Sequence, residues 1–152
     1  MADTRIQRAV EDWVRRNWMP QQYGVDFFRE RVTLTSGGVF DFDAVSADRS
    51  IVANISTSSA TTASGKLGVG KLTKIRSDIY FLLLAEAKRR IMVLTDRTMY
   101  ERCMKEAEAG RVPDSIEFAH AEIPEELAAK LHEAKSRASK EVSPPQPTSN
   151  GV

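Results

Sequence analysis

The fold is decided by the stretch FDFDAVSADRSIVANIST, residues 40–57. Apolar and polar side chains alternate over 39–45, and IVANIST, 51–57, is a second strand-like run, so each predicts a β-strand. The turn SADRS between them is short, which indicates that the two strands are antiparallel neighbours. Upstream, FFRERVTLT, 27–35, also alternates and is joined to the next strand by the turn SGG. The sequence therefore predicts a three-stranded antiparallel meander.

Helical periodicity flanks this meander on both sides. Over residues 4–18 apolar side chains recur at helical spacing opposite charged ones, which predicts an amphipathic helix. Thr4 is expected to cap this helix, Pro20 to end it, and Arg15 to lie on its charged side. After the meander, the pattern predicts a helix over 71–88, a buried strand over 90–96, a helix over 97–109, an outer strand over 115–123 and a helix from Pro124 to 142.

These elements predict one α/β domain over residues 1–142, built on a mixed sheet that contains the meander. The chain has 152 residues, a length that suits a single domain. The last stretch, SPPQPTSNGV at 143–152, has no means of packing against the domain and is predicted to be disordered.

Composition and charge give few indications of a partner. The net charge of +1 offers no global attraction to nucleic acid or to anionic membranes, so such binding requires local patches. The single cysteine, Cys103, excludes an internal disulfide. The charged N-terminal stretch lacks a signal-peptide core, and the longest apolar run, 79–85, is too short to span a bilayer. We therefore expect a cytoplasmic protein that makes no use of a membrane.

The stretch GKLGVGKL has the spacing of a phosphate-binding loop. Gly65, Gly70 and Lys71 fit that spacing, and a helix is predicted to follow. However, Leu72 occupies the position where a Ser or Thr would hold magnesium, and Thr73 is displaced by about 100° around the helix. Glycine punctuation before a helix is the favoured interpretation, and a nucleotide-binding loop is the alternative.

Two aspartates on the second strand form a further candidate site. Asp41 and Asp43 are two residues apart, so they lie on the same face of that strand. A carboxylate within a largely apolar strand is costly to bury unless a cation or hydrogen bonds satisfy it. The pair therefore predicts a polar pocket on one side of the sheet, and the alternative is a solvated sheet edge.

The order helix, three-stranded meander, helix, strand resembles the αβββαβ core of the PD-(D/E)XK nucleases, the restriction-endonuclease-like fold. The resemblance covers residues 4–96 and leaves a C-terminal α-β-α extension. It implies a metal-dependent phosphodiesterase, an endonuclease, in which an aspartate ends the second strand and Glu-x-Lys or Asp-x-Lys lies on the third. The acidic pair holds Mg²⁺, and the lysine orients the attacking water.

The residues that match this pattern imply a degenerate site. Asp43 matches the aspartate, while Asn54 stands at the second acid and Ser56 at the lysine. Glu11 matches an auxiliary acid of some members, so Asp43 and Glu11 are the implied metal ligands. Arg76 is expected to replace the lysine or to form a structural salt bridge with Asp43. Because an amide is a weaker magnesium ligand than a carboxylate, Mg²⁺ is expected to bind weakly.

Basic residues near the glycine-rich stretch predict contact with nucleic acid. Lys66, Lys71 and Lys74 cluster there with Arg76, although Lys74 itself is expected to reach solvent. Three functions follow as hypotheses. The first is a nuclease-like protein with an eroded site, binding DNA or a partner protein without efficient cleavage. The second is an active Mg-dependent nuclease with a migrated site, using Asp43 with Asp41 or Glu11. The third is a nucleotide binder with a phosphate loop.

Overall fold

The computed structural model describes residues 4–61 and 68–142. The predicted disordered tail, and Gly65 and Lys66 of the glycine-rich stretch, lie outside these described residues. None of the helices in the described part of the chain combines the length and apolar character that a membrane span requires.

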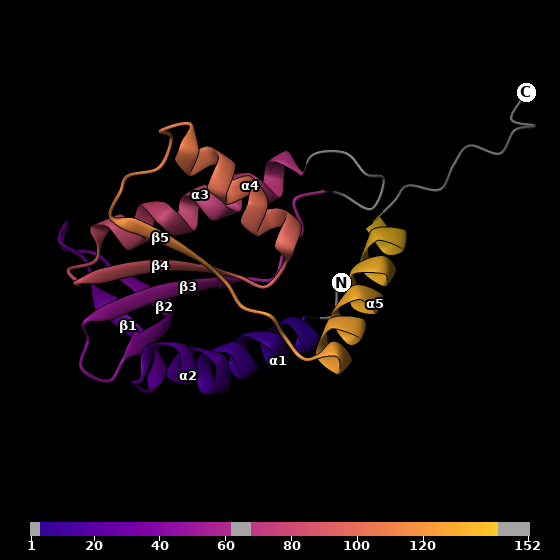
Figure 1. The fold of residues 1–152 in the computed structure, drawn as a ribbon, viewed down its shortest axis with the longest axis horizontal. Helices are drawn as coiled ribbons and strands as arrows, with labels where there is room; N and C mark the ends of the chain where they lie inside the picture. The colour runs from indigo at the N-terminus through magenta and orange to yellow at the C-terminus, as the bar shows by residue number, and fades with distance from the viewer. Residues whose placement is uncertain (1–3, 62–67, 143–152) are drawn as a thin grey trace, which may run out of the picture.

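A five-stranded mixed sheet forms the centre of the molecule (Figure 1). Its strands lie side by side in chain order, with the first three antiparallel and the last two parallel to β3. This arrangement confirms the predicted α/β class, the meander and the mixed sheet. The strands are β1 Phe27–Thr33, β2 Val39–Ser46, β3 Ile51–Ser56, β4 Arg89–Leu94 and β5 Ile116–His120.

Helices cover both faces of the sheet. Helices α3 and α4 lie over one face, while the N-terminal helical segments lie against the other, where α5 packs beside α1 (Figure 1). The segments are α1 Arg5–Trp13, the π-helical η1 Val14–Trp18, α2 Met19–Tyr23, α3 Val69–Leu84, α4 Arg97–Glu108 and α5 Glu125–Val142.

Alternating side chains of the inner strands divide the core into two parts. Val52 and Met92 belong to the core beneath α3 and α4, whereas their neighbours Ala53 and Ile91 belong to the core beneath α1. This alternation follows from the period of two in a strand. Strands β3 and β4 are therefore buried on both faces, which for β4 is what the apolar run over 90–96 predicts.

The prediction that the first helix ends at Pro20 is wrong. The helix continues through Pro20 and ends at Gly24, whose backbone is left-handed with φ 74°. Pro20 follows the wider π-helical turn η1 and lies in the first turn of α2, where a missing backbone N–H is tolerated. Thr4 occupies the predicted cap position, but its side chain makes no capping hydrogen bond.

The left-handed end of this helix can be tested with a substitution at Gly24, compared with a glycine substitution in α3. Gly24→Ala should lower the free energy of unfolding by about 1 kcal/mol, because a left-handed backbone disfavours a side chain. Gly70→Ala, in the first turn of α3 with open space around an added Cβ, should raise it by about 0.5 kcal/mol. Urea denaturation followed by circular dichroism measures both, and a Gly24→Ala variant as stable as the wild type would contradict this prediction.

Candidate functional site

The candidate site lies where β2 and β3 separate. The two strands pair at Val45–Val52 and Ala44–Ala53, and Asp43 is the next residue of β2. Asp43 and Ala44 together lie opposite a single residue of β1, because the register of β1 and β2 shifts there. Such a bulge bends a strand and redirects its side chains, which is common beside functional sites.

Side chains bridge the gap between the separating strands. The Asp43 Oδ2 atom accepts a hydrogen bond from the backbone N–H of Ile55 at 2.8 Å. The Asn54 Oδ1 atom accepts from the backbone N–H of Asp43 at 3.4 Å, and its Nδ2 donates to the carbonyl of Asp78 at 3.2 Å. Asn54 is only 1% exposed, so both ends of its amide are committed to holding β2, β3 and α3 together.

Carboxylates approach Asp43 from both faces of the sheet. Burial, followed by the negative charge of Asp43, raises the pKa of Glu11 on α1 to about 7. Burial also raises the pKa of Asp43, and the charge of Asp78 on α3 adds to this effect. The gap between the strands therefore places the carboxylates of Glu11 and Asp78 within electrostatic reach of Asp43.

Three cations offset part of this negative charge. Lys74 Nζ lies 3.0 Å from Asp78 Oδ1, and its positive charge partly offsets the rise in pKa that burial causes at Asp78 and Asp43. Arg29 also lowers the pKa of Asp43. The buried Arg15 donates from Nη1 to the Asp43 carbonyl at 3.1 Å, and its Nη2 pairs with Asp12. The site is thus a mixed-charge cluster built around Asp43.

The structure brings together part of the set that the resemblance implies. Asp43 and Asn54 are in contact, and Glu11 interacts electrostatically with Asp43. Ser56 lies further along β3, where its Oγ accepts a hydrogen bond from the Ser58 N–H at 3.2 Å. Arg76 is not part of this group, because its guanidinium pairs with Glu106 of α4 at 3.3 Å.

The lysines and the second aspartate have separate environments. Lys71 Nζ donates to the carbonyl of Thr61 at 3.4 Å. The sequence predicts that Lys74 reaches solvent; its side chain is 72% exposed, and its Nζ forms an ion pair with Asp78. Asp41 is exposed and paired with Arg31 across the strands at 2.9 Å, which lowers the pKa of Asp41. Of these residues, Lys74 belongs to the Asp43 cluster.

Thr73 and Asp96, which bear on the phosphate-loop alternative, have local partners within or next to their own helices. Thr73 Oγ1 donates to the carbonyl of Val69 within α3 at 2.9 Å. Asp96, which follows β4 where phosphate-loop enzymes carry an aspartate, caps α4 by accepting from the Met99 N–H at 3.1 Å. These hydroxyl and carboxylate groups are thus engaged in holding their own helices.

Arg15, Arg29 and Asp78 are site residues that sequence reasoning missed. Lys74 and Asp78 have the i, i+4 spacing of a helical ion pair, so this contact had a signal in the sequence. Arg15 belongs to the π-helical turn η1 and is buried, although the sequence predicts it on the charged side of the helix. No pattern in the sequence marks that turn.

The fit of a magnesium ion rests on the oxygens that remain available. One oxygen of Asp43 accepts from Ile55, and Asn54 contributes only a neutral oxygen that already accepts a hydrogen bond. In the described ranges, no group of three or more His, Cys, Asp or Glu side chains is placed to hold a metal ion. This donor set fits Mg²⁺ poorly, since the ion favours well-placed carboxylate oxygens.

Comparison of this chain with protein families, with curated proteins and with solved structures finds no match.

The raised pKa of Glu11 makes stability depend on pH. A carboxyl with a raised pKa stabilises the folded state at low pH, and this contribution is lost as pH rises through about 7. Between pH 4.5 and pH 8, the free energy of unfolding of Glu11→Gln should therefore rise relative to that of the wild type. The expected rise is about 1 to 2 kcal/mol after allowance for solvent screening. Urea denaturation across this range measures the difference. Exposed Glu101→Gln is the control, and parallel curves for wild type and Glu11→Gln would contradict the prediction.

Proposed function

We propose that this chain is a nuclease-like protein of the restriction-endonuclease-like type, which binds nucleic acid without efficient cleavage. The observation that carries the proposal is the meeting of Asp43 and Asn54 where β2 and β3 separate. At this point the resemblance implies two acids, and this chain supplies one acid and one amide.

The arrangement of the elements supports the kinship. A helix, a three-stranded meander, a second helix and a strand parallel to β3 follow one another in the implied αβββαβ order. Helices α1 and α3 lie on opposite faces of the sheet, and each brings a carboxylate to the strand gap. The proposed site is therefore built from the same elements that the resemblance implies.

The chemistry of the site supports binding rather than efficient cleavage. The Asn54 amide is buried and engaged at both ends, so it is not free to take the role of a second acid. Ser56 supplies a hydroxyl where a cation would stabilise the charged phosphate. Loss of one such electrostatic partner typically lowers a rate by about 100- to 1000-fold.

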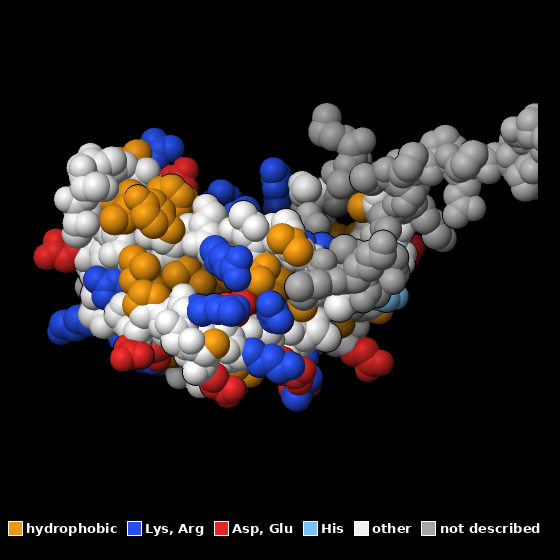
Figure 2. Space-filling view, turned by 90° about the horizontal axis from the view of Figure 1, so that it is seen from above, with side chains coloured by type: hydrophobic (Ala, Val, Ile, Leu, Met, Phe, Trp, Pro, Cys, Tyr) orange, Lys and Arg blue, Asp and Glu red, His pale blue; other side chains and the backbone are white. Residues whose placement is uncertain are grey.

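Basic residues on α3 support contact with a phosphate backbone. Lys71, Lys74 and Arg76 lie on successive parts of this helix, and the side chains of Lys74 and Arg76 are 72% and 55% exposed. Figure 2 shows Lys and Arg side chains gathered across the face that α3 and α4 present. Such a local patch can bind nucleic acid although the chain is nearly neutral overall.

An active nuclease with a migrated site is the second candidate, favoured by the position of Lys74. Its ammonium group lies beside Asp78 and acts on the pKa of Asp43. In this hypothesis Lys74, rather than Arg76, replaces the strand lysine, and Asp43 acts with Glu11 and Asp78. The two candidates differ in whether magnesium supports cleavage.

Nucleic-acid binding is tested with a labelled DNA duplex and fluorescence anisotropy. Lys71→Ala/Lys74→Ala should weaken binding by about tenfold and reduce the salt dependence, with a change in slope of about 1 for each phosphate that the protein no longer neutralises. Lys130→Ala, on the exposed side of α5, removes a positive charge elsewhere and should have little effect. Equal weakening in the two variants, or a wild type that binds neither duplex nor single strand at low salt, would overturn the proposal.

Cleavage is tested with supercoiled plasmid in Mg²⁺ or Mn²⁺. We expect the wild type to nick plasmid no faster than Asp43→Asn, which keeps an acceptor for Ile55. Near-isosteric Asn54→Asp restores the second acid and should tighten Mg²⁺ binding by about tenfold, as measured by calorimetry. Plasmid nicking by the wild type that Asp43→Asn abolishes would instead establish the active nuclease.

A further inference from the structure

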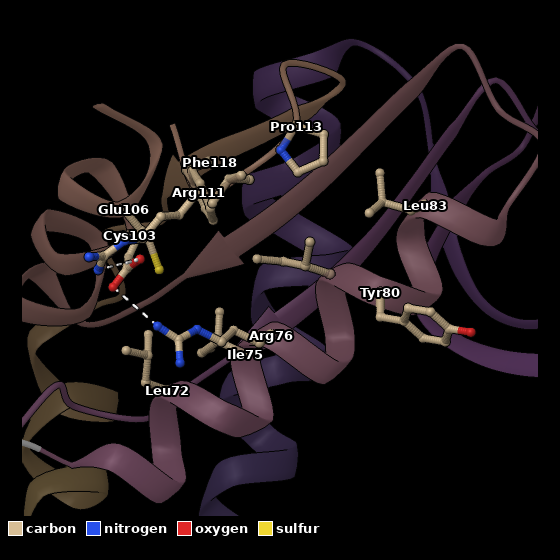
Figure 3. A pocket seen from close by; sticks show the side chains of 12 residues that line it. Leu72, Ile75, Arg76, Tyr80, Leu83, Cys103, Glu106, Arg111, Pro113 and Phe118 are labelled. Atoms are coloured by element: carbon tan, nitrogen blue, oxygen red, sulfur yellow. Dashed lines mark hydrogen bonds and ion pairs between the residues drawn. The ribbon is translucent and has the colours of Figure 1, made fainter. Parts of the chain in front are cut away.

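A cavity of about 210 Å³ opens between α3, α4 and β5, away from the Asp43 cluster (Figure 3). Burial raises the pKa of the Cys103 thiol in its wall to about 11, so this thiol is neutral near pH 7 and acts as an apolar group. The walls are mainly aliphatic and aromatic. Residues that form them include Leu72, Ile75, Ile79, Leu83, Val112 and Phe118.

An excess of positive charge lies beside this apolar cavity. The buried carboxylate of Glu106 faces three guanidinium groups, from Arg76 at 3.3 Å, Arg102 at 3.4 Å and Arg111 at 3.5 Å. Arg76 and Arg111 also line the cavity, and their side chains are 55% and 66% exposed. One negative charge thus faces three positive charges, which leaves a local excess of two.

These arginines are loosely paired compared with another ion pair of the same chain. Arg89 binds Glu117 in a bidentate pair, with N···O distances of 2.9 and 2.7 Å. Around Glu106, the N···O distance of each arginine is instead 3.3 Å or longer. The buried Nε of Arg102, an arginine that pairs with Glu106 but does not line the cavity, has no hydrogen-bond partner among the described residues. The cluster therefore retains donor capacity for a second acceptor.

We infer that this cavity binds a small carboxylate with an apolar body. The apolar part fits between α3 and β5, against Ile79 and Phe118, while the carboxylate accepts hydrogen bonds from Arg76 and Arg111 at the mouth. A volume of about 210 Å³ is below the ~300 to 1,000 Å³ of pockets for drug-sized ligands, so the ligand is small. A phosphate backbone would meet the arginines but leave the apolar walls unfilled.

Calorimetry with the full chain tests the inference, with hexanoate as the probe. Hexanol supplies the apolar body alone and acetate the charge alone, so each should bind at least about tenfold more weakly than hexanoate. Arg111→Gln should weaken hexanoate binding by about tenfold. Glu106→Gln should strengthen it, because this near-isosteric change removes the competing carboxylate.

Matched variants separate the cavity from general charge effects. Arg97→Gln removes an exposed arginine outside the cavity and should leave hexanoate binding unchanged. Leu83→Trp fills the cavity without changing charge and should abolish hexanoate binding, so it decides the matter if Arg111→Gln fails to fold. Hexanol binding as tightly as hexanoate, no hexanoate binding at millimolar concentration, or unchanged binding by Leu83→Trp would overturn the inference. Lys71→Ala/Lys74→Ala should not affect hexanoate, so this proposal and the nucleic-acid proposal fail independently.

Discussion

The hydrogen bond from the Ile55 N–H to the Asp43 carboxylate is the contact on which the candidate site depends. A buried backbone N–H must find an acceptor, and the pairing of β2 with β3 ends at Ala44–Ala53, before it reaches Ile55. The Asp43 side chain takes that role and is fixed between the strands. A carboxylate held there interacts with charged side chains of the helices on both faces of the sheet. The need for an acceptor at the Ile55 N–H therefore also places a charged group at the centre of the site.

The charged groups around Asp43 affect both the stability of the fold and the chemistry of the site. Asp43 repels both Glu11 and Asp78 in a half-buried setting, and burial raises the pKa of each of the three carboxyls. Lys74 and Arg15 offset this cost, the first through an ion pair with Asp78 and the second through the carbonyl of Asp43. A cluster of perturbed carboxylates is a common mark of a functional site, although structural networks also produce it. The neutral Asn54 within this cluster is consistent with the proposal that the protein binds nucleic acid without efficient cleavage.

Helix α3 connects the two proposed sites while keeping them apart. Lys74 and Asp78 face the gap between β2 and β3, whereas Arg76 and Ile79 face the cavity beside α4. The turn of about 100° per residue directs neighbouring residues to different sides. One helix can therefore carry a polar cluster and an arginine-lined apolar cavity, and each can be altered without direct change to the other.

The sequence alone determined the order of helices and strands and the meander, because these follow from local periodicity and short turns, whereas the meeting of Asp43 with Asn54 was implied by the family resemblance. Only the tertiary structure decided the partners of the charged side chains. The sequence led to the expectation that Arg76 acts beside Asp43, but it could not tell that Arg76 would instead pair with Glu106 of α4. The bulge at Asp43 depends on the register with β1, and the π-helical turn that contains the buried Arg15 has no local signature. Periodicity reports which face is buried, whereas contacts between distant segments exist only once the layers have packed.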